Sequence, residues 1–403
     1  MTRPAELLAP AGSMESLDAA VRFGADAVYL GGPSMQLRAG QTAFSLADIQ
    51  TAAQKLHAAG KRLFVAANAF TYSNEISFMQ DYARRLLDAG ADAMIVSDIG
   101  AIRAVKRACP GMEVHVSTQA NCLNHESCLV YRDLGAKRVV LGRELSIDQI
   151  REIRARIPDD LELEAFVHGA MCMAYSGRCL LSTYLTGRSA NRGGCAQSCR
   201  WSFALTEEKR PGQYFPIEED ENGTTILSSY DLNAMPLIDR ILDAGVSSLK
   251  IEGRMKTAYY VATVVNAYRM RLSGASLDEC LSELNAASHR PYSTGFYEGE
   301  IKTAPNAPAY YFKTREYLGY VLAVRDGRAE VEVKNKVSPG REVEILSPGR
   351  IFRFRADDLR DPDGNPLPAA TVPNSRFTLP VPDGVAPGDY LRAPCAAEAD
   401  GAL

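Results

Sequence analysis

The chain has 403 residues, a formal net charge of −4 and 46% hydrophobic residues. This length favours two domains or one barrel with an appendage, and it allows a large core. No apolar run approaches about 18 residues and the N-terminus has no secretory pattern, so we expect a cytoplasmic protein without a membrane anchor. The weak negative charge excludes a generally basic surface for nucleic acids, but a local basic patch is compatible with it.

The first predicted elements are a strand at residues 6–11 and a helix at 13–24 that ends in glycine. A helix, a glycine and an apolar strand then follow one another repeatedly, and a glycine suits the left-handed residue that ends a helix. Further strands are predicted at 113–119 and 161–168. The repeated glycines are Gly24, Gly60, Gly90, Gly135 and Gly245.

Eight short apolar strands alternate with helices, as parallel βα units require. We therefore predict an α/β protein with a TIM-type (βα)8 barrel over roughly residues 5–275. A doubly wound open sheet is the rival, but no GxGxxG turn follows the first strand. After residue 305, short alternating strands separated by Gly, Pro and Asp predict a small antiparallel β-barrel.

The predicted domains are accordingly a barrel catalytic domain at residues 1–304 and a C-terminal β-barrel domain at 305–403. An unusually long segment separates the seventh strand from the eighth, and it holds a cysteine-bearing insertion at 170–230. The sequence does not indicate an oligomeric state.

In such barrels the chemistry lies at the carboxyl ends of the strands, where the βα loops surround a common mouth. His168, Glu252 and Arg254 lie at predicted strand ends and are our candidate catalytic residues. A strand histidine is often only a structural donor, and Lys250 and Glu252 have a plain alternative as an ion pair inside the barrel. The predicted strand-end positions are 10–12, 31–32, 68, 98, 117–119, 143–144, 168–169 and 252–254.

Four of the nine cysteines fall within 28 residues of the insertion. An odd number of cysteines in a chain without a secretion signal argues against a disulfide framework. Concentrated thiolates suit a soft metal centre, and the spacing favours an iron–sulfur cluster over zinc, whose sites usually show two close Cys-x2-4-Cys pairs. Zinc and unmetallated thiols stay open as alternatives. The predicted ligands are Cys172, Cys179, Cys195 and Cys199.

Residues 171–200 contain four arginines and no Asp or Glu, so the insertion is a local positive island. Arg188 and Arg192, together with Arg254 at the barrel mouth, are candidate substrate-binding residues, since guanidinium groups bind carboxylate and phosphate through two hydrogen bonds. The insertion arginines have a plainer alternative, which is to balance the thiolate charge.

Three segments, ELLAPAG, EAFVHGAMCMAYSGRCLLS and SLKIEGRMKTAYYVATVVNAYR, resemble peptidase family U32, the collagenase-like peptidases. The similarity covers roughly the whole barrel. In several members of that family such cysteines hold a 4Fe–4S cluster, so the resemblance implies this cofactor on the four cysteines.

The NRGGCAQSCRW segment and the short β-rich tail are most similar to the branch that hydroxylates C5 of wobble uridine in tRNA without molecular oxygen. This resemblance implies prephenate as hydroxyl donor, a tRNA anticodon loop as partner and a small anionic co-substrate. Other branches act on ribosomal RNA or in ubiquinone hydroxylation. A U32-type peptidase and a non-enzymatic RNA-binding or assembly subunit stay open as alternatives, although no protease nucleophile or HExxH motif is present.

Overall fold

The computed structural model describes residues 5–37, 43–172, 175–198, 218–220, 223–225, 230–299 and 311–395. Two compact units can be distinguished by their internal contacts. One comprises Met1–Val21, Ala25–Thr257 and Arg290–Tyr311, and the other comprises Arg22–Gly24, Ala258–His289 and Phe312–Leu403. In the described part of the chain, no helix is both long enough and apolar enough to cross a membrane.

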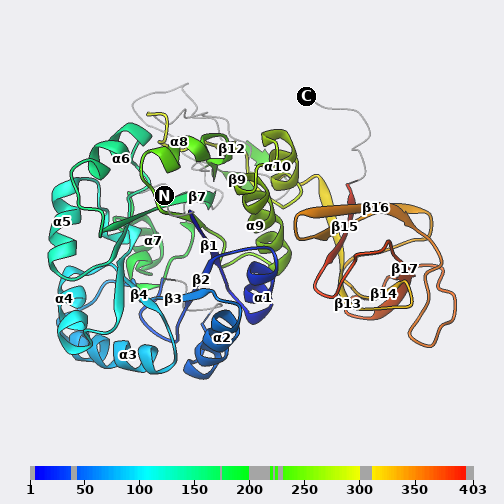
Figure 1. The fold of residues 1–403 in the computed structure, drawn as a ribbon, viewed down its shortest axis with the longest axis horizontal. Coiled ribbons are helices and arrows are strands. Elements are labelled where there is room, and N and C mark those ends of the chain that lie inside the picture. Colours follow the sequence, from blue (N-terminus) through cyan, green and yellow to red (C-terminus); the bar gives the residue numbers. More distant parts are fainter. Residues whose placement is uncertain are drawn as a thin grey trace. The chain divides into compact units, whose positions relative to one another are not determined.

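The first unit is a closed barrel of eight parallel strands (Figure 1). Each strand pairs with the next along the chain, and the eighth strand, β11, pairs in parallel with both β1 and β7 and so closes the cylinder. The predicted TIM-type barrel is therefore confirmed. Its strands are β1 (Glu6–Pro10), β2 (Ala27–Gly31), β3 (Arg62–Ala66), β4 (Ala93–Val96), β5 (Glu113–Val116), β6 (Arg138–Val140), β7 (Glu162–Ala170) and β11 (Ser248–Ile251).

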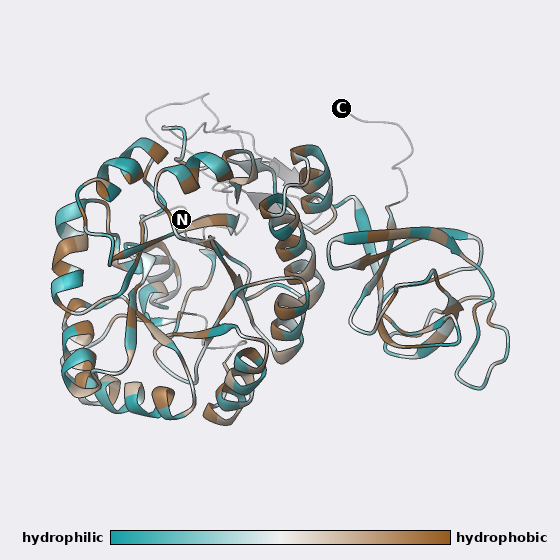
Figure 2. Ribbon diagram, viewed as in Figure 1, coloured by the Kyte–Doolittle hydropathy of each residue, from teal (hydrophilic) through white to brown (hydrophobic). Residues whose placement is uncertain are grey.

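Helices surround these strands, and hydrophobic residues alternate with hydrophilic ones along them (Figures 1 and 2). Several helices begin at a side-chain cap, such as Ser45, whose hydroxyl accepts the backbone N–H of Asp48. All five repeated glycines have the positive φ that the sequence predicted. The helices are α1 (Met14–Arg22), α2 (Leu46–Ala58), α3 (Ile76–Asp88), α4 (Ile99–Ala108), α5 (His125–Asp133), α6 (Ile147–Arg154) and α8 (Ile238–Asp243).

The barrel interior contains a buried network of charged side chains. Arg138 contacts Glu6 at 2.5 Å, Glu162 at 2.7 Å and Glu164 at 2.9 Å. Lys250 Nζ lies 2.7 Å from the other carboxylate oxygen of Glu164. Removing one member would leave a buried charge without its partner, which destabilises a folded protein.

Short elements from several segments complete the barrel unit. β10 (Asp231–Asn233) pairs antiparallel with the end of β7, and β12 (Tyr292–Ser293) pairs with β10. The remaining elements are α7 (Leu181–Thr186), the hairpin β8 (Glu218–Asp220) and β9 (Gly223–Thr225), and the 3-10 turns η1 (Ser73–Glu75), η2 (Thr118–Ala120), η3 (Ala190–Arg192) and η5 (Met235–Leu237).

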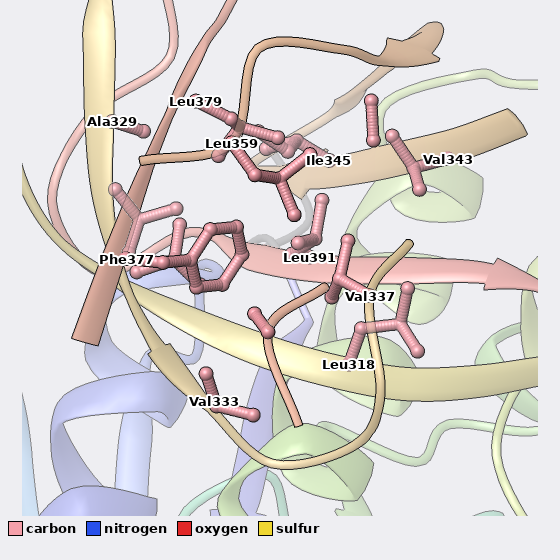
Figure 3. Close-up of a cluster of buried hydrophobic side chains, with 14 of the residues drawn as sticks. Leu318, Ala329, Val333, Val337, Val343, Ile345, Leu359, Phe377, Leu379 and Leu391 are labelled. Carbon is pink, nitrogen blue, oxygen red and sulfur yellow. The ribbon is translucent and has the colours of Figure 1, made fainter. Parts of the chain in front are cut away.

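The second unit contains two helices, α9 (Ala258–Leu272) and α10 (Leu277–Leu284), and a six-stranded antiparallel sheet coiled into a half-barrel. Its core is formed by aliphatic side chains together with Phe352 and Phe377, and Phe377 is labelled in Figure 3. A buried Arg392 joins α10 to the sheet through Glu283 at 2.7 Å and Glu344 at 3.0 Å. The strands are β13 (Arg315–Arg325), β14 (Arg328–Val333), β15 (Arg341–Ser347), β16 (Arg350–Ala356), β17 (Arg376–Pro380) and β18 (Tyr390–Pro394).

Candidate active site at the barrel mouth

A cavity of about 330 Å³ lies at the carboxyl ends of the barrel strands. Its lining includes Cys172 and Cys195 from the insertion. Not every predicted strand-end residue reaches it, because Asp98 caps α4 and Glu144 accepts the backbone N–H of Ser176 at 2.9 Å. Polar and aromatic residues from the barrel strands and their loops also line the cavity, among them Asn68, Ser117, Arg143, Phe166, Glu252 and Arg254.

Tyr29 on β2 contributes a buried hydroxyl to the cavity. It donates toward the carbonyl of Ile251 at 3.0 Å and the Glu252 carboxylate at 3.1 Å. Burial, reinforced by the charge of Glu252, raises the pKa of Tyr29 well above its usual value. The phenol therefore stays protonated and holds Glu252 at the edge of the cavity.

Arg254, a predicted catalytic and substrate-binding residue, lines the cavity and is only 6% exposed. Its Nη1 donates to the Gln36 side chain at 3.1 Å, and Gln36 donates in turn to the carbonyl of Gly32 at 2.6 Å. A Cβ at Gly31 would overlap the Gln36 amide, so the glycine leaves room for this amide in its present position. The guanidinium is thus positioned by a second layer of hydrogen bonds.

Lys250 does not form the ion pair with Glu252 that the sequence offered as a plain interpretation. It pairs with Glu164, one layer deeper in the barrel, because residues 250 and 252 lie at different heights along the strand. Burial would raise the pKa of Glu164, but Lys250 and Arg138 outweigh it and lower that pKa to about 2. Glu164 is therefore a fixed anion of the barrel core.

His168, the third predicted catalytic residue, is buried on β7 and is not among the side chains that line the cavity. Its ring packs 5.4 Å from the ring of Tyr292. His115 is also buried, and it contacts Glu113 at 2.8 Å. Within the described ranges no three His, Cys, Asp or Glu side chains gather to hold a single metal ion.

The cysteine-bearing segment is attached to the barrel mouth at Ser176 and Gly177. The backbone N–H of Ser176 donates to Glu144, and Gly177 lies so close to η2 that a Cβ would sit 2.0 Å from the Gln119 carbonyl oxygen. Gly177 also has a φ of +74°, which L residues adopt at a cost. This close approach holds the segment against the strand ends.

Of the four predicted cluster ligands, Cys172 and Cys195 line the cavity, Cys179 is half-buried and Cys199 lies outside the described residues. The backbone N–H of Gln197 donates to the Cys195 sulfur at 3.4 Å. The Cys179 carbonyl accepts the Asn191 side chain at 2.9 Å. Soft sulfur donors facing one cavity, with a backbone N–H directed at one of them, fit an iron–sulfur cluster, whose thiolates each bind a different iron.

The two predicted substrate-binding arginines of the insertion differ in their surroundings. Arg192 makes a two-pronged ion pair with Glu75, with both N–O distances at 2.7 Å, and its guanidinium lies 4.3 Å from the Tyr72 ring centroid. It joins the insertion to η1. Arg188 is exposed, and no described carboxylate pairs with it.

Comparison with known proteins identifies the family. The model of peptidase family U32 matches residues 12–305, and the model of its C-terminal domain matches residues 313–392. The chain belongs to peptidase family U32. The resemblance predicted from the barrel motifs is therefore confirmed.

The relatives of this U32 chain carry two kinds of name. It is 35% identical to tRNA hydroxylation protein P of Escherichia coli, over 94% of each chain. It is also 35% identical to tRNA hydroxylation protein P1 of Bacillus subtilis, over 97% of this chain and 95% of that protein. It is 32% identical to a protein named collagenase from Porphyromonas gingivalis, over 96% of this chain and 97% of that protein.

Some cavity residues of this U32 chain were not selected from the sequence. Arg143 was placed at a strand end but not proposed for a role, and Tyr29 and Phe166 were read only as parts of strands. Position was the available signal for Arg143, since it follows β6 and reaches the cavity. Tyr29 and Phe166 carry no such signal, because aromatic residues in strands usually serve packing.

Proposed function

We propose that this protein is an iron–sulfur enzyme that hydroxylates C5 of wobble uridine in tRNA, with prephenate as the hydroxyl donor and without molecular oxygen. The observation that carries the proposal is a cavity at the catalytic end of the barrel that is lined both by insertion cysteines and by guanidinium groups. The similarity to tRNA hydroxylation proteins over nearly the whole chain supports it. We also place the protein in the cytoplasm, where tRNA is modified and thiols stay reduced.

Cys172, Cys179, Cys195 and Cys199 would hold a 4Fe–4S cluster beside this cavity. Replacing the C5–H of uridine by C5–OH removes two electrons from the base, and a bound cluster would pass these electrons to a soluble electron acceptor. Arg254 would bind a carboxylate of the donor. Glu252, fixed by the Tyr29 hydroxyl, is the one carboxylate among the described lining residues and is our candidate to accept a proton.

The target base must leave its stack to reach a cavity inside the barrel mouth, which is easier in an anticodon loop than in a duplex. Exposed Arg188 is available to bind a phosphate of the loop. Arg192 would hold the insertion in position for substrate binding, since Glu75 already pairs with its guanidinium. His168, buried beside Tyr292, would act on the site through β7 rather than by contact with substrate.

The test is mass analysis of tRNA from a strain that lacks this gene and any other member of the branch. Wild-type protein should restore a wobble uridine heavier by one oxygen atom, and Cys172→Ala should not. Cys395→Ala is the matched control, because that half-buried cysteine belongs to the second unit. Unchanged hydroxylation in the deletion strain would contradict the proposal.

A peptidase is the second candidate, favoured by the similarity to the Porphyromonas gingivalis collagenase. Cleavage of gelatin or collagen peptides by purified protein, lost in Arg254→Ala, would support it. A non-enzymatic RNA-binding subunit would instead bind tRNA while Cys172→Ala left the modification unchanged.

A further inference from the structure

The cavity has an unequal balance of charge. Four of its described lining residues are cations, namely Arg143, Lys250, Arg254 and Lys256, and one, Glu252, is a carboxylate. Lys250 is already neutralised by Glu164 beneath it. The lining therefore suits a ligand that carries more than one negative charge.

Arg143 is presented to the cavity in a fixed orientation. Its guanidinium carbon lies 3.8 Å from the centroid of the Phe166 ring, which is a close cation–π contact. Its Nη1 donates to the Ala170 carbonyl at 2.8 Å and approaches the Met171 sulfur at 3.8 Å. No described carboxylate pairs with Arg143, and no described acceptor takes a hydrogen bond from its Nε or Nη2. This edge of the guanidinium can bind a ligand carboxylate through two hydrogen bonds.

Arg143 follows β6 and Arg254 follows β11, the two barrel strands that flank β7, and both side chains line the cavity. The Arg254 guanidinium carbon lies 5.8 Å from the Tyr29 ring centroid. Both guanidinium groups are close enough to the Tyr29 hydroxyl to favour its charged form, although burial and Glu252 dominate. One small molecule can therefore contact both arginines.

A further polar group faces this space. Asn68 lines the cavity, is 9% exposed and donates its amide nitrogen to Ser117 at 3.0 Å. Its amide oxygen is buried and accepts no hydrogen bond from the described residues. Since buried acceptors are nearly always paired, this oxygen points to a ligand that donates a hydrogen bond, such as a hydroxyl.

We propose that Arg143 is the specificity-determining residue for a small dianionic co-substrate. Arg143 binds one carboxylate over the Phe166 ring, Arg254 binds the second, and the Asn68 amide oxygen accepts a hydrogen bond from a hydroxyl of the same molecule. This inference rests on the proposed function for the identity of the dianion. It goes beyond it in assigning one of the two carboxylates to Arg143, in the loop that follows β6.

The test is calorimetric titration of the anaerobically purified protein, at neutral pH and without RNA. Prephenate, with two carboxylates and a hydroxyl, is compared with phenylpyruvate, which has one carboxylate and no hydroxyl on its ring. Wild-type protein should bind prephenate roughly 10- to 100-fold more tightly, the range expected for charge-assisted hydrogen bonds. Arg143→Ala should weaken prephenate binding by a similar factor and leave phenylpyruvate binding nearly unchanged.

Arg143→Lys keeps the charge but loses the planar fork, so it should recover part of the preference. If Arg143→Ala disturbs the Ala170 carbonyl and lowers the iron content, the binding of the two compounds to Arg143→Lys tests the assignment instead. Arg107→Ala, on the exposed side of α4, is the matched control and should bind both compounds as wild type does.

Equal losses for the two compounds, or no loss in Arg143→Ala and Arg143→Lys, would overturn the assignment. Failure of the proposed function gives a different pattern. If the deletion strain keeps its hydroxylated uridine while Arg143→Ala loses the preference for prephenate, the pocket assignment stands and the RNA assignment falls.

Discussion

Gly177→Ala should detach the cysteine-bearing segment from the barrel while the barrel itself stays folded. The added methyl carbon would lie 2.0 Å from the Gln119 carbonyl oxygen, far inside van der Waals contact. Alanine at a φ of +74° costs about 1–2 kcal/mol, and relief of such an overlap typically adds about 1–3 kcal/mol. Because both costs fall on the inserted segment and not on a barrel strand, they are relieved by movement of that segment rather than by unfolding of the strands.

The chain offers a matched control in Gly187→Ala. Gly187 has a φ of +70°, and a Cβ there would meet nothing within 4 Å. It therefore carries the backbone cost alone, about 1–2 kcal/mol. Iron and sulfide per chain are measured after anaerobic purification, together with the thermal unfolding midpoint of each variant.

Gly177→Ala should lose most of its iron and Gly187→Ala should keep most of it, with similar unfolding midpoints. Equal iron content in the two variants would refute the reasoning that contact with Gln119 positions the cysteines.

Three further predictions concern the charged side chains of the barrel unit. Lys250→Met should destabilise the protein by about 3–5 kcal/mol in chemical denaturation, since it leaves the buried Glu164 carboxylate without one of its two cations. Adding Glu164→Gln to this variant should recover part of the lost stability. A loss under 1 kcal/mol would contradict the buried ion pair. Glu164 has a pKa of about 2, below its usual 4.5. Its carboxylate therefore contributes about 3 kcal/mol to the free energy of unfolding, and this contribution is present above pH 4.5 and is lost as the pH falls toward 2. Wild-type stability should therefore fall more steeply than that of the Lys250→Met/Glu164→Gln double variant over this range, and equal slopes would show that Glu164 is not ionised in the fold. Arg192→Ala and Glu75→Gln should show a coupling of about 1 kcal/mol in a double-mutant cycle, whereas additive effects would indicate that the pair does not hold the insertion.

The barrel could be predicted from sequence because its signals are local. A glycine such as Gly24 follows five of the barrel helices, two or three residues before an apolar strand, so one such unit can be recognised without reference to the others. The position of the mouth follows from the architecture, which is why Arg254 and Glu252 were found in the cavity.

The remaining features depend on contacts between residues that are distant in the sequence. Arg192 and Glu75 are 117 positions apart, and nothing near either residue indicates the other. The height of a residue along its strand decides whether Lys250 meets Glu164 or Glu252, and strand register is not visible in one sequence. His168 was expected in the cavity, but the pairing of β10 with the end of β7 accompanies its burial beside Tyr292.

The most direct test of the central claim is the iron content of anaerobically purified protein in which single cysteines are replaced by serine. If the insertion cysteines share one cluster, wild-type protein is coloured and holds iron and acid-labile sulfide in equal amounts. Most of the iron and sulfide is then lost in each of the variants Cys172→Ser, Cys195→Ser and Cys199→Ser. Colourless wild-type protein, or a Cys199→Ser variant with its full iron content, would contradict a cluster held by these residues.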